Sequence, residues 1–102
     1  MIEIDGKEYE LKYNLRRVEL IENTTEEPLM ALLRKNKGYL SLQNLKVCFS
    51  FGLKEAGSDV FVPVKKGQEF AEKLIEDEGY DNVDMLVVEA LQRDCPFFFP
   101  AV

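Results

Sequence analysis

Hydrophobic and polar residues alternate over the first thirteen positions of the chain, with the period of a β-strand. The dipeptide Asp5-Gly6 interrupts this alternation, and such a pair tolerates the two positive φ angles of a type I′ turn. A two-residue loop fixes the register of a hairpin and places Ile2 opposite Tyr9. We therefore expect a β-hairpin over residues 1–13. Its apolar face is predicted to consist of Ile2, Ile4, Tyr9, Leu11 and Tyr13.

A hairpin of two strands is only marginally stable in water, so its apolar face is expected to cover helices. The edges of the hairpin remain open to a further strand. The β-branched run Val60-Phe61-Val62 is one candidate for that strand, and a strand from a partner is the other.

Residues 14–38 predict two short helices. Asn14 is a typical N-cap for a helix that extends to about residue 23. The run Thr24-Thr25-Glu26-Glu27-Pro28 repeats the signals of a helix start, with cap hydroxyls, acidic residues and an early proline. A second helix should follow and end near Gly38. The residues expected to point inward from the first helix are Leu15, Val18, Leu20 and Ile21.

A third helix is predicted to begin at Ser41 and to be broken by Gly57-Ser58-Asp59. Its apolar residues cover a wide arc, which is typical of a central helix. Cys48 lies on this arc, and we expect a buried, inert thiol there. The residues of the arc are Leu42, Leu45 and Phe49 on one stripe, and Val47 and Phe51 on a neighbouring one.

Two more helices are predicted in the second half of the chain. The fourth helix can start at Pro63 and should stop at Gly79, and the fifth is expected to be capped by Asp81 and ended by Pro96. The fourth helix has Phe70, Ala71, Leu74 and Ile75 at helical spacing. The fifth has the cleanest apolar stripe of the chain, formed by Val83, Leu86, Val87, Ala90, Leu91 and Cys95.

These elements predict an α+β fold that is mostly helical, with an N-terminal β-hairpin followed by four or five packed helices. The 102 residues fit one domain, divided into the hairpin 1–13, a helical body 14–95 and an aromatic C-terminal tail 96–102. The core is predicted to contain Leu45, Phe49, Leu74, Leu86, Val87 and Leu91.

Composition narrows the range of partners. The net charge of −6 arises mainly in residues 52–102, which hold eleven acidic and five basic residues. We find no basic patch with aromatic residues between its charges, so binding to nucleic acid is not expected. Neither a membrane span nor a basic, then apolar, leader is recognisable, and two cysteines are too few for a disulfide framework. A cytoplasmic protein is therefore expected, without membrane association.

Catalytic signals are weak. The chain has no histidine, which removes the commonest general base and the commonest transition-metal ligand. The acidic cluster at positions 76–84 lacks the alternating ligands of a calcium loop, and no phosphate-binding loop or dinucleotide fingerprint is present. We expect no enzyme, cofactor or metal site. An enzyme that uses a carboxylate pair or Cys95 is kept as a competing hypothesis.

The most unusual segment is the C-terminal run of three phenylalanines between two prolines, because three consecutive aromatic residues cannot all face one core. Either the tail folds back and buries two of the rings, or it is a contact segment for a partner. Self-association is expected from this surplus of apolar surface. The candidate protein-binding residues are Phe97, Phe98, Phe99, Tyr39 and Phe61.

Three segments support a resemblance. They are residues 4–15 (IDGKEYELKYNL), residues 39–46 (YLSLQNLK) and the helix end at Phe51-Gly52-Leu53, followed by a helical pair. In these features the chain resembles the tail assembly chaperones of long-tailed (siphovirus-type) phages and prophages of Gram-positive bacteria. The resemblance implies a protein that binds the tape-measure protein, keeps it soluble and assists tail-tube assembly around it.

The same resemblance implies that the protein acts in the host cytoplasm, self-associates, and is not part of the mature virion. The tail-tube protein is a further possible partner. A strand-Asp-Gly-strand opening followed by a helix also occurs in phage tail proteins that build the tube. The alternative is therefore a structural tail component, a tube or completion protein that is retained in the virion.

Overall fold

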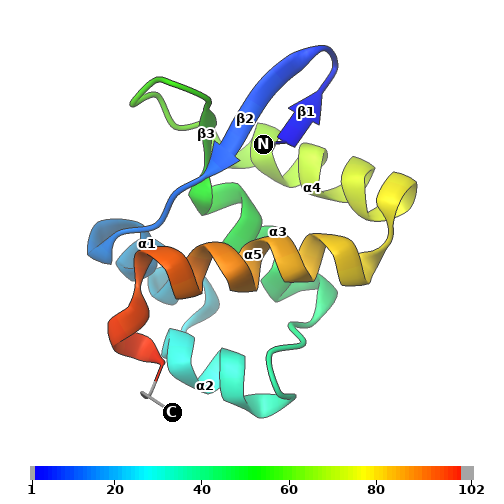
Figure 1. The fold of residues 1–102 in the computed structure, drawn as a ribbon. Helices are drawn as coiled ribbons and strands as arrows, with labels where there is room; N and C mark the ends of the chain where they lie inside the picture. The colour runs from blue at the N-terminus through cyan, green and yellow to red at the C-terminus, as the bar shows by residue number, and fades with distance from the viewer. Residues whose placement is uncertain (1, 100–102) are drawn as a thin grey trace.

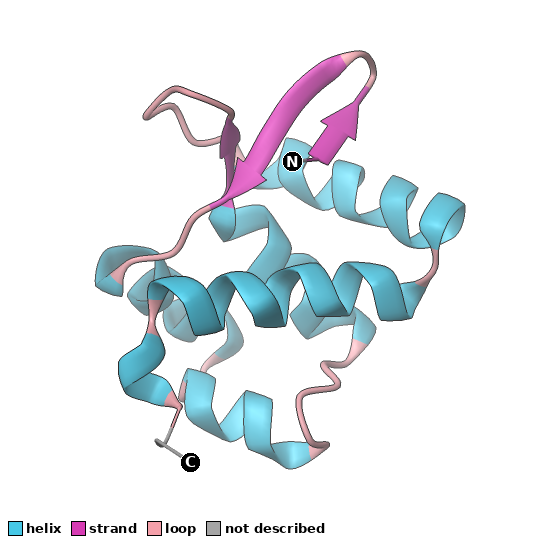
Figure 2. Cartoon of the chain, in the orientation of Figure 1, coloured by secondary structure: helices cyan, strands magenta, loops and turns pink. Residues whose placement is uncertain are grey.

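The computed structural model describes residues 2–99, so position 1 of the predicted hairpin and positions 100–102 of the predicted aromatic tail lie outside the described part. The strands lie together at one end of the molecule, and the helices form the rest (Figures 1 and 2). This arrangement confirms the predicted α+β, mostly helical fold with its N-terminal hairpin. The elements are β1 (Ile2–Ile4), β2 (Lys7–Leu11), α1 (Leu15–Thr25), α2 (Leu29–Lys35), α3 (Leu42–Gly52), β3 (Leu53–Glu55), α4 (Val64–Glu78), α5 (Tyr80–Asp94) and the short 3-10 helix η1 (Pro96–Phe98).

The hairpin has the register that its turn predicts. Ile2 pairs with Tyr9, and Ile4 with Lys7. Both turn residues have positive φ angles, 51° at Asp5 and 78° at Gly6, as a type I′ turn requires. The predicted apolar face is buried throughout, so the alternation of the first thirteen residues places the hairpin directly on the helices.

The third strand differs from both candidates. It is β3, which begins directly after α3 and pairs antiparallel with β2, with Leu11 opposite Leu53. The β-branched segment lies one position further out, where the Val62 N–H donates to the Leu53 carbonyl at 2.9 Å and Phe61 bridges to Lys54. Leu53 is fully buried. The strand that follows α3 therefore joins the sheet, because its Leu53 fills the core beneath the sheet. The segment Val60-Phe61-Val62 lies along the outer edge of this strand.

The caps of α1 and α3 are those predicted. The Asn14 side chain accepts from the Arg17 N–H at 2.9 Å, and the Ser41 hydroxyl accepts from the Asn44 N–H at 3.1 Å. However, α3 ends at Gly52, within the segment Phe51-Gly52-Leu53, and before the predicted break at Gly57-Ser58-Asp59, because the chain turns there into β3.

The start signals of α2 and α5 were assigned to the wrong residues. Thr24 and Thr25 are the last residues of α1, and their hydroxyls donate back to carbonyls of that helix. The first N–H of α2 instead donates to the Glu22 carboxylate at 2.7 Å. Gly79 stands at the N-cap position of α5, so Asp81 lies within the first turn. Its negative charge is stabilised there by the helix dipole.

Helix α3 is central, as its wide apolar arc predicts: Leu45 and every residue from Val47 to Gly52 are buried. Its contact with α4 is close, since a Cβ added to Gly67 would lie 2.9 Å from the Ser50 Cα. Cys48 lies on this buried arc as expected. Among residues 2–99, no helix has the length and apolar character needed to cross a bilayer.

Five of the six predicted core residues are buried, namely Leu45, Phe49, Leu74, Val87 and Leu91. The sixth, Leu86, is only partly buried, because it faces the space between α5 and the hairpin. Leu15 and Leu42 were expected to point inward but are exposed. Each is the first residue of its helix and projects beyond the part of the helix that packs against the body.

Candidate protein-binding site

A groove follows one side of α5, between this helix and the segment formed by α2 and the loop after it. In Figure 1, α2 and η1 lie alongside α5 on this side. The groove consists of two adjoining hollows of about 270 and 230 Å³ that share Lys37, Gly38 and Val88. We call it the α2–α5 groove. Its first part is lined by Tyr39, Asp81, Asp84 and Met85, and its second part by Met30, Leu33, Arg34, Gln92, Phe98 and Phe99.

The α5 wall of this groove has a regular helical pattern. Its residues recur at positions 81, 84, 85, 88 and 92, which is the spacing of one helix face. With a rise of 1.5 Å per residue, this face is about 17 Å long. Met85 and Val88 lie at its centre, and Met85 is 55% exposed. The groove is therefore long enough to hold about three turns of a partner helix.

The loop after α2 positions Tyr39 over the groove. Lys37 and Gly38 both have positive φ angles, and the Gly38 N–H donates to the Leu33 carbonyl at 2.7 Å, which closes the end of α2. Tyr39 follows with 56% of its surface exposed. The α2 ending therefore brings an aromatic ring to the rim beside α5.

Two residues of α5, one turn apart, hold the backbone of Leu40. The Asp84 Oδ1 accepts from the Leu40 N–H at 3.1 Å, and the Tyr80 hydroxyl donates to the Leu40 carbonyl. Asp84 is 5% exposed, and burial raises the pKa of its carboxyl, although the hydrogen bond from Leu40 acts in the opposite direction. Burial likewise raises the pKa of Tyr80. Tyr39 is therefore attached to α5 through its neighbour in the chain.

The aromatic tail divides between the body and solvent. Phe98 and Phe99 are partly buried against the core and line the second part of the groove. Phe97 is 62% exposed, and its ring centroid lies 4.9 Å from that of Phe98. Two of the three rings therefore pack on the protein's own helices, as the first of the two alternatives expects, and the third ring stays free beside the groove.

Phe61 lies outside the groove, at the outer edge of β3. The Arg17 guanidinium carbon lies 3.9 Å from the centroid of its ring, so this aromatic is covered by a cation of the same chain. The structure thus brings Tyr39, Phe98 and Phe99 to one groove, places Phe97 beside it, and separates Phe61 from them.

Sequence reasoning missed three apolar residues that line the groove, which are Met30, Met85 and Val88. A signal was available on α5: Met85 and Val88 widen its apolar stripe on one side beyond the buried positions. A second apolar flank on a helix that already has a buried face is typical of a contact surface.

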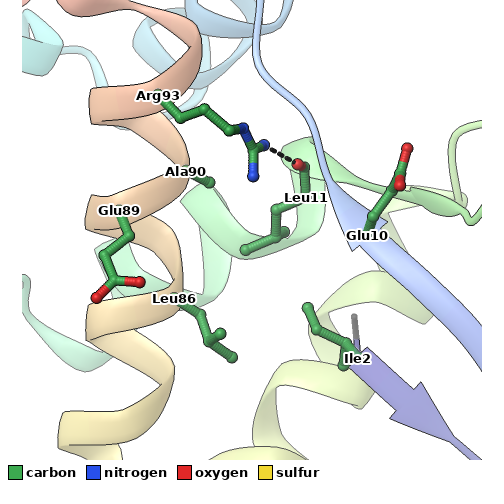
Figure 3. Close-up of a pocket in the computed structure, with 7 residues that line it drawn as sticks. All are labelled: Ile2, Glu10, Leu11, Leu86, Glu89, Ala90 and Arg93. Atoms are coloured by element: carbon green, nitrogen blue, oxygen red, sulfur yellow. Dashed lines mark hydrogen bonds between the residues drawn. The ribbon is translucent and has the colours of Figure 1, made fainter.

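A third hollow, of about 440 Å³, lies between the hairpin and α5 (Figure 3). Leu11, Leu86 and Ala90 form its apolar wall together with Ile2. The Arg93 Nη2 reaches across it and donates to the Leu11 carbonyl at 2.5 Å. This hollow is therefore bridged by the protein's own side chain and differs from the α2–α5 groove, in which Met85 and Tyr39 are more than half exposed.

The cysteine and acidic side chains are the remaining candidates for catalysis or metal binding. Cys48 and Cys95 are both buried, and burial raises the pKa of the Cys48 thiol to about 12, which keeps it in the unreactive protonated form. Within residues 2–99, no group of three or more cysteine, aspartate or glutamate side chains is arranged to hold a metal ion.

Comparison of this chain with protein-family models, with curated proteins and with solved structures finds no match.

Proposed function

We propose that this protein is a tail assembly chaperone of a long-tailed phage or prophage of Gram-positive bacteria, which binds the tape-measure protein and assists tail-tube assembly. The observation that carries the proposal is the α2–α5 groove, an open groove with apolar side chains in both of its parts and the length of about three helical turns. The protein acts in the host cytoplasm and leaves before the virion is complete.

The groove suits a helical partner. A chaperone for a tape-measure protein must cover apolar helix stripes that would otherwise aggregate before the tube surrounds them. Helix-in-groove binding is a recurrent solution, in which apolar residues of the bound helix at positions i, i+3, i+4 and i+7 enter a channel between two helices of the receptor. The channel between α2 and α5 has this form.

The side chains in the groove suit a partner of varied sequence. Met30 and Met85 have flexible, polarisable side chains that adapt to differently shaped apolar surfaces. Tyr39 adds aromatic area to the first part of the groove and Phe99 to the second, and aromatic residues are enriched at interfaces. Methionine and aromatic side chains together therefore support binding to many similar apolar stripes along one long protein.

The test is co-expression with the long tape-measure-like protein encoded in the same operon. The soluble yield of that protein should rise when this chain is present. Met85→Lys places a charge at the centre of the groove and should abolish the rise. Leu42→Lys is the matched control, because Leu42 is 57% exposed against 55% for Met85 but lies on α3, outside the groove. This control should keep full chaperone activity.

Three results would contradict the proposal. One is a tape-measure-like protein that is equally soluble alone. Another is the presence of this chain in purified virions at stoichiometric amounts, which would make it a structural tail component. The third is a stable dimer in light scattering that Met85→Lys dissociates, because the groove would then hold a second copy of this chain.

A further inference from the structure

We propose that the first part of the α2–α5 groove is a socket for one cationic side chain, a lysine or arginine, of the bound helix. This inference rests on the proposed function and names the chemical feature by which the partner is recognised. The socket is formed by Asp84, Asp81 and Tyr39, and the distribution of charge along the groove supports it.

Asp84 supplies a carboxylate that accepts fewer hydrogen bonds than it can. It is 5% exposed and lines the groove, and its Oδ1 accepts from the Leu40 N–H. Its Oδ2 makes no hydrogen bond with any residue from 2 to 99. A carboxylate can accept about four hydrogen bonds, and a charge-assisted bond from a cation is stronger than one from a neutral donor. No buried side-chain oxygen of the described residues lacks a hydrogen-bond partner, so Oδ2 is open to solvent, and a partner's cation would replace water there with a charge-assisted bond.

Asp81 and Tyr39 complete the socket. Asp81 lies one turn before Asp84 on the same wall of α5 and is exposed, so it adds negative charge at the entrance. Tyr39 presents an aromatic ring on the opposite wall, and the face of such a ring attracts an ammonium or guanidinium group. Two carboxylates and an aromatic ring around one hollow select a cation over a neutral side chain.

The protein's own cations leave the socket open. Lys37 lines its rim but forms no ion pair with any residue in the described part of the chain. Arg34 lies in the second part of the groove, beyond Val88. Asp81 and Asp84 thus make one part of the groove negative, Arg34 makes the other positive, and Lys37 lies where the two parts meet, so the groove also sets the direction in which a helix binds.

The pattern of the partner follows from this distribution. Asp84 and Gln92 are eight residues apart on α5, or about 12 Å along its axis. The bound helix should therefore carry one lysine or arginine, then apolar residues over about the next two turns, and no basic residue at the end that faces Arg34.

The experiment uses overlapping synthetic peptides of about twenty residues that tile the tape-measure-like protein of the same operon, a length that allows a helix to form on binding. Their affinity for the full chain is measured by fluorescence anisotropy. Tiles that bind should contain the basic residue at one end of an apolar stripe. Replacing that residue by glutamine should weaken binding about tenfold.

Asp84→Asn is the decisive variant, because its amide oxygen can still accept from the Leu40 N–H while the charge is removed. It should weaken the binding of wild-type peptides about tenfold. It should not weaken the binding of the glutamine peptides further, as expected when the two side chains form a direct pair. Glu89→Gln, an exposed charge removal on α5 outside the groove, should leave affinity unchanged. Circular dichroism checks that each variant is folded.

The outcomes separate the two proposals. The cationic socket is overturned if peptides bind equally well with and without their basic residue. It is also overturned if the affinity losses caused by the glutamine peptide and by Asp84→Asn add. In both cases the chaperone proposal stands. If no tile binds the wild-type chain, the proposed function fails and the socket fails with it.

Discussion

The backbone N–H of Tyr13 donates a hydrogen bond to the Asp94 Oδ2 at 2.9 Å, although 81 positions separate the two residues. The bond joins the end of the hairpin to the last residue of α5. Two cations of the same region, Arg93 and Lys12, contact the other carboxylate oxygen at 2.8 and 3.4 Å. The Asp94 side chain is 4% exposed, so this junction is shielded from solvent.

The junction at Asp94 predicts a loss of stability in acid. Burial alone would raise its pKa, but the hydrogen bonds from Arg93 and Tyr13 lower it from the ordinary 3.8 to about 2. A lowered carboxyl pKa stabilises the fold above the unfolded pKa, and this contribution disappears as the pH falls from about 4 to about 2. It amounts to about 2 kcal/mol at neutral pH.

Asp94→Asn should therefore lower the free energy of unfolding at pH 7, measured in urea. The difference from wild type should shrink as the pH approaches 2. Asp77→Asn is a suitable control, because Asp77 is exposed on α4 and forms no ion pair with the described residues. A constant difference between wild type and Asp94→Asn at all pH values would contradict the assignment.

Leu91 and Leu86 provide a matched pair on α5. Leu91 is fully buried, and its replacement by alanine should cost about 2–5 kcal/mol of unfolding free energy, because a cavity remains in the core. Leu86 is only partly buried at the hollow beside the hairpin, so Leu86→Ala should cost about 1 kcal/mol. Denaturant unfolding of both variants tests the order; equal losses would show that α5 is rotated relative to this description.

Gly52→Ala should destabilise the protein by about 1–3 kcal/mol through overpacking. A Cβ at this position would lie 2.3 Å from a ring atom of Tyr13. The ring cannot easily move, since Tyr13 is 1% exposed and its hydroxyl donates to the Cys48 carbonyl at 2.7 Å. Combining Gly52→Ala with Tyr13→Leu should cost less than the sum of the single losses, and strict additivity would argue against this contact.

Both thiols should be unreactive in the folded protein. Cys48 and Cys95 are buried, and burial raises the pKa of both thiols, that of Cys48 to about 12, so the reactive thiolate is rare at pH 8. Ellman's reagent should modify neither residue within minutes in native buffer and both in denaturant. Rapid modification of the native protein would revive the hypothesis of a catalytic Cys95.

The hairpin could be predicted in full because its information is local. The turn Asp5-Gly6 sets the register, and the alternation of side chains sets the buried face. The strand β3 could not be predicted in this way. It has only three residues, and its position depends on pairing with β2 some forty residues earlier in the chain.

The candidate site was predictable only in its aromatic part. Tyr39, Phe98 and Phe99 attracted attention because they stand next to helix ends and breaks, where one core cannot easily absorb them. Asp84 belongs to the acidic cluster at positions 76–84 of the sequence, but the structure buries its side chain, which accepts a hydrogen bond from the Leu40 N–H. That difference arises because its partner comes from a loop 44 residues away, which no periodicity on α5 reveals.

The junction between Tyr13 and Asp94 also affects how the protein forms on the ribosome. The hairpin is synthesised before α5, so the helix that completes its anchoring emerges from the ribosome after it. Until α5 emerges, the nascent chain lacks the buried Val83, Val87 and Leu91 and exposes the apolar surface that they cover. The fold can therefore close only after all of α5 has left the ribosome, and a chain stalled before that point remains a target for cellular chaperones and proteases.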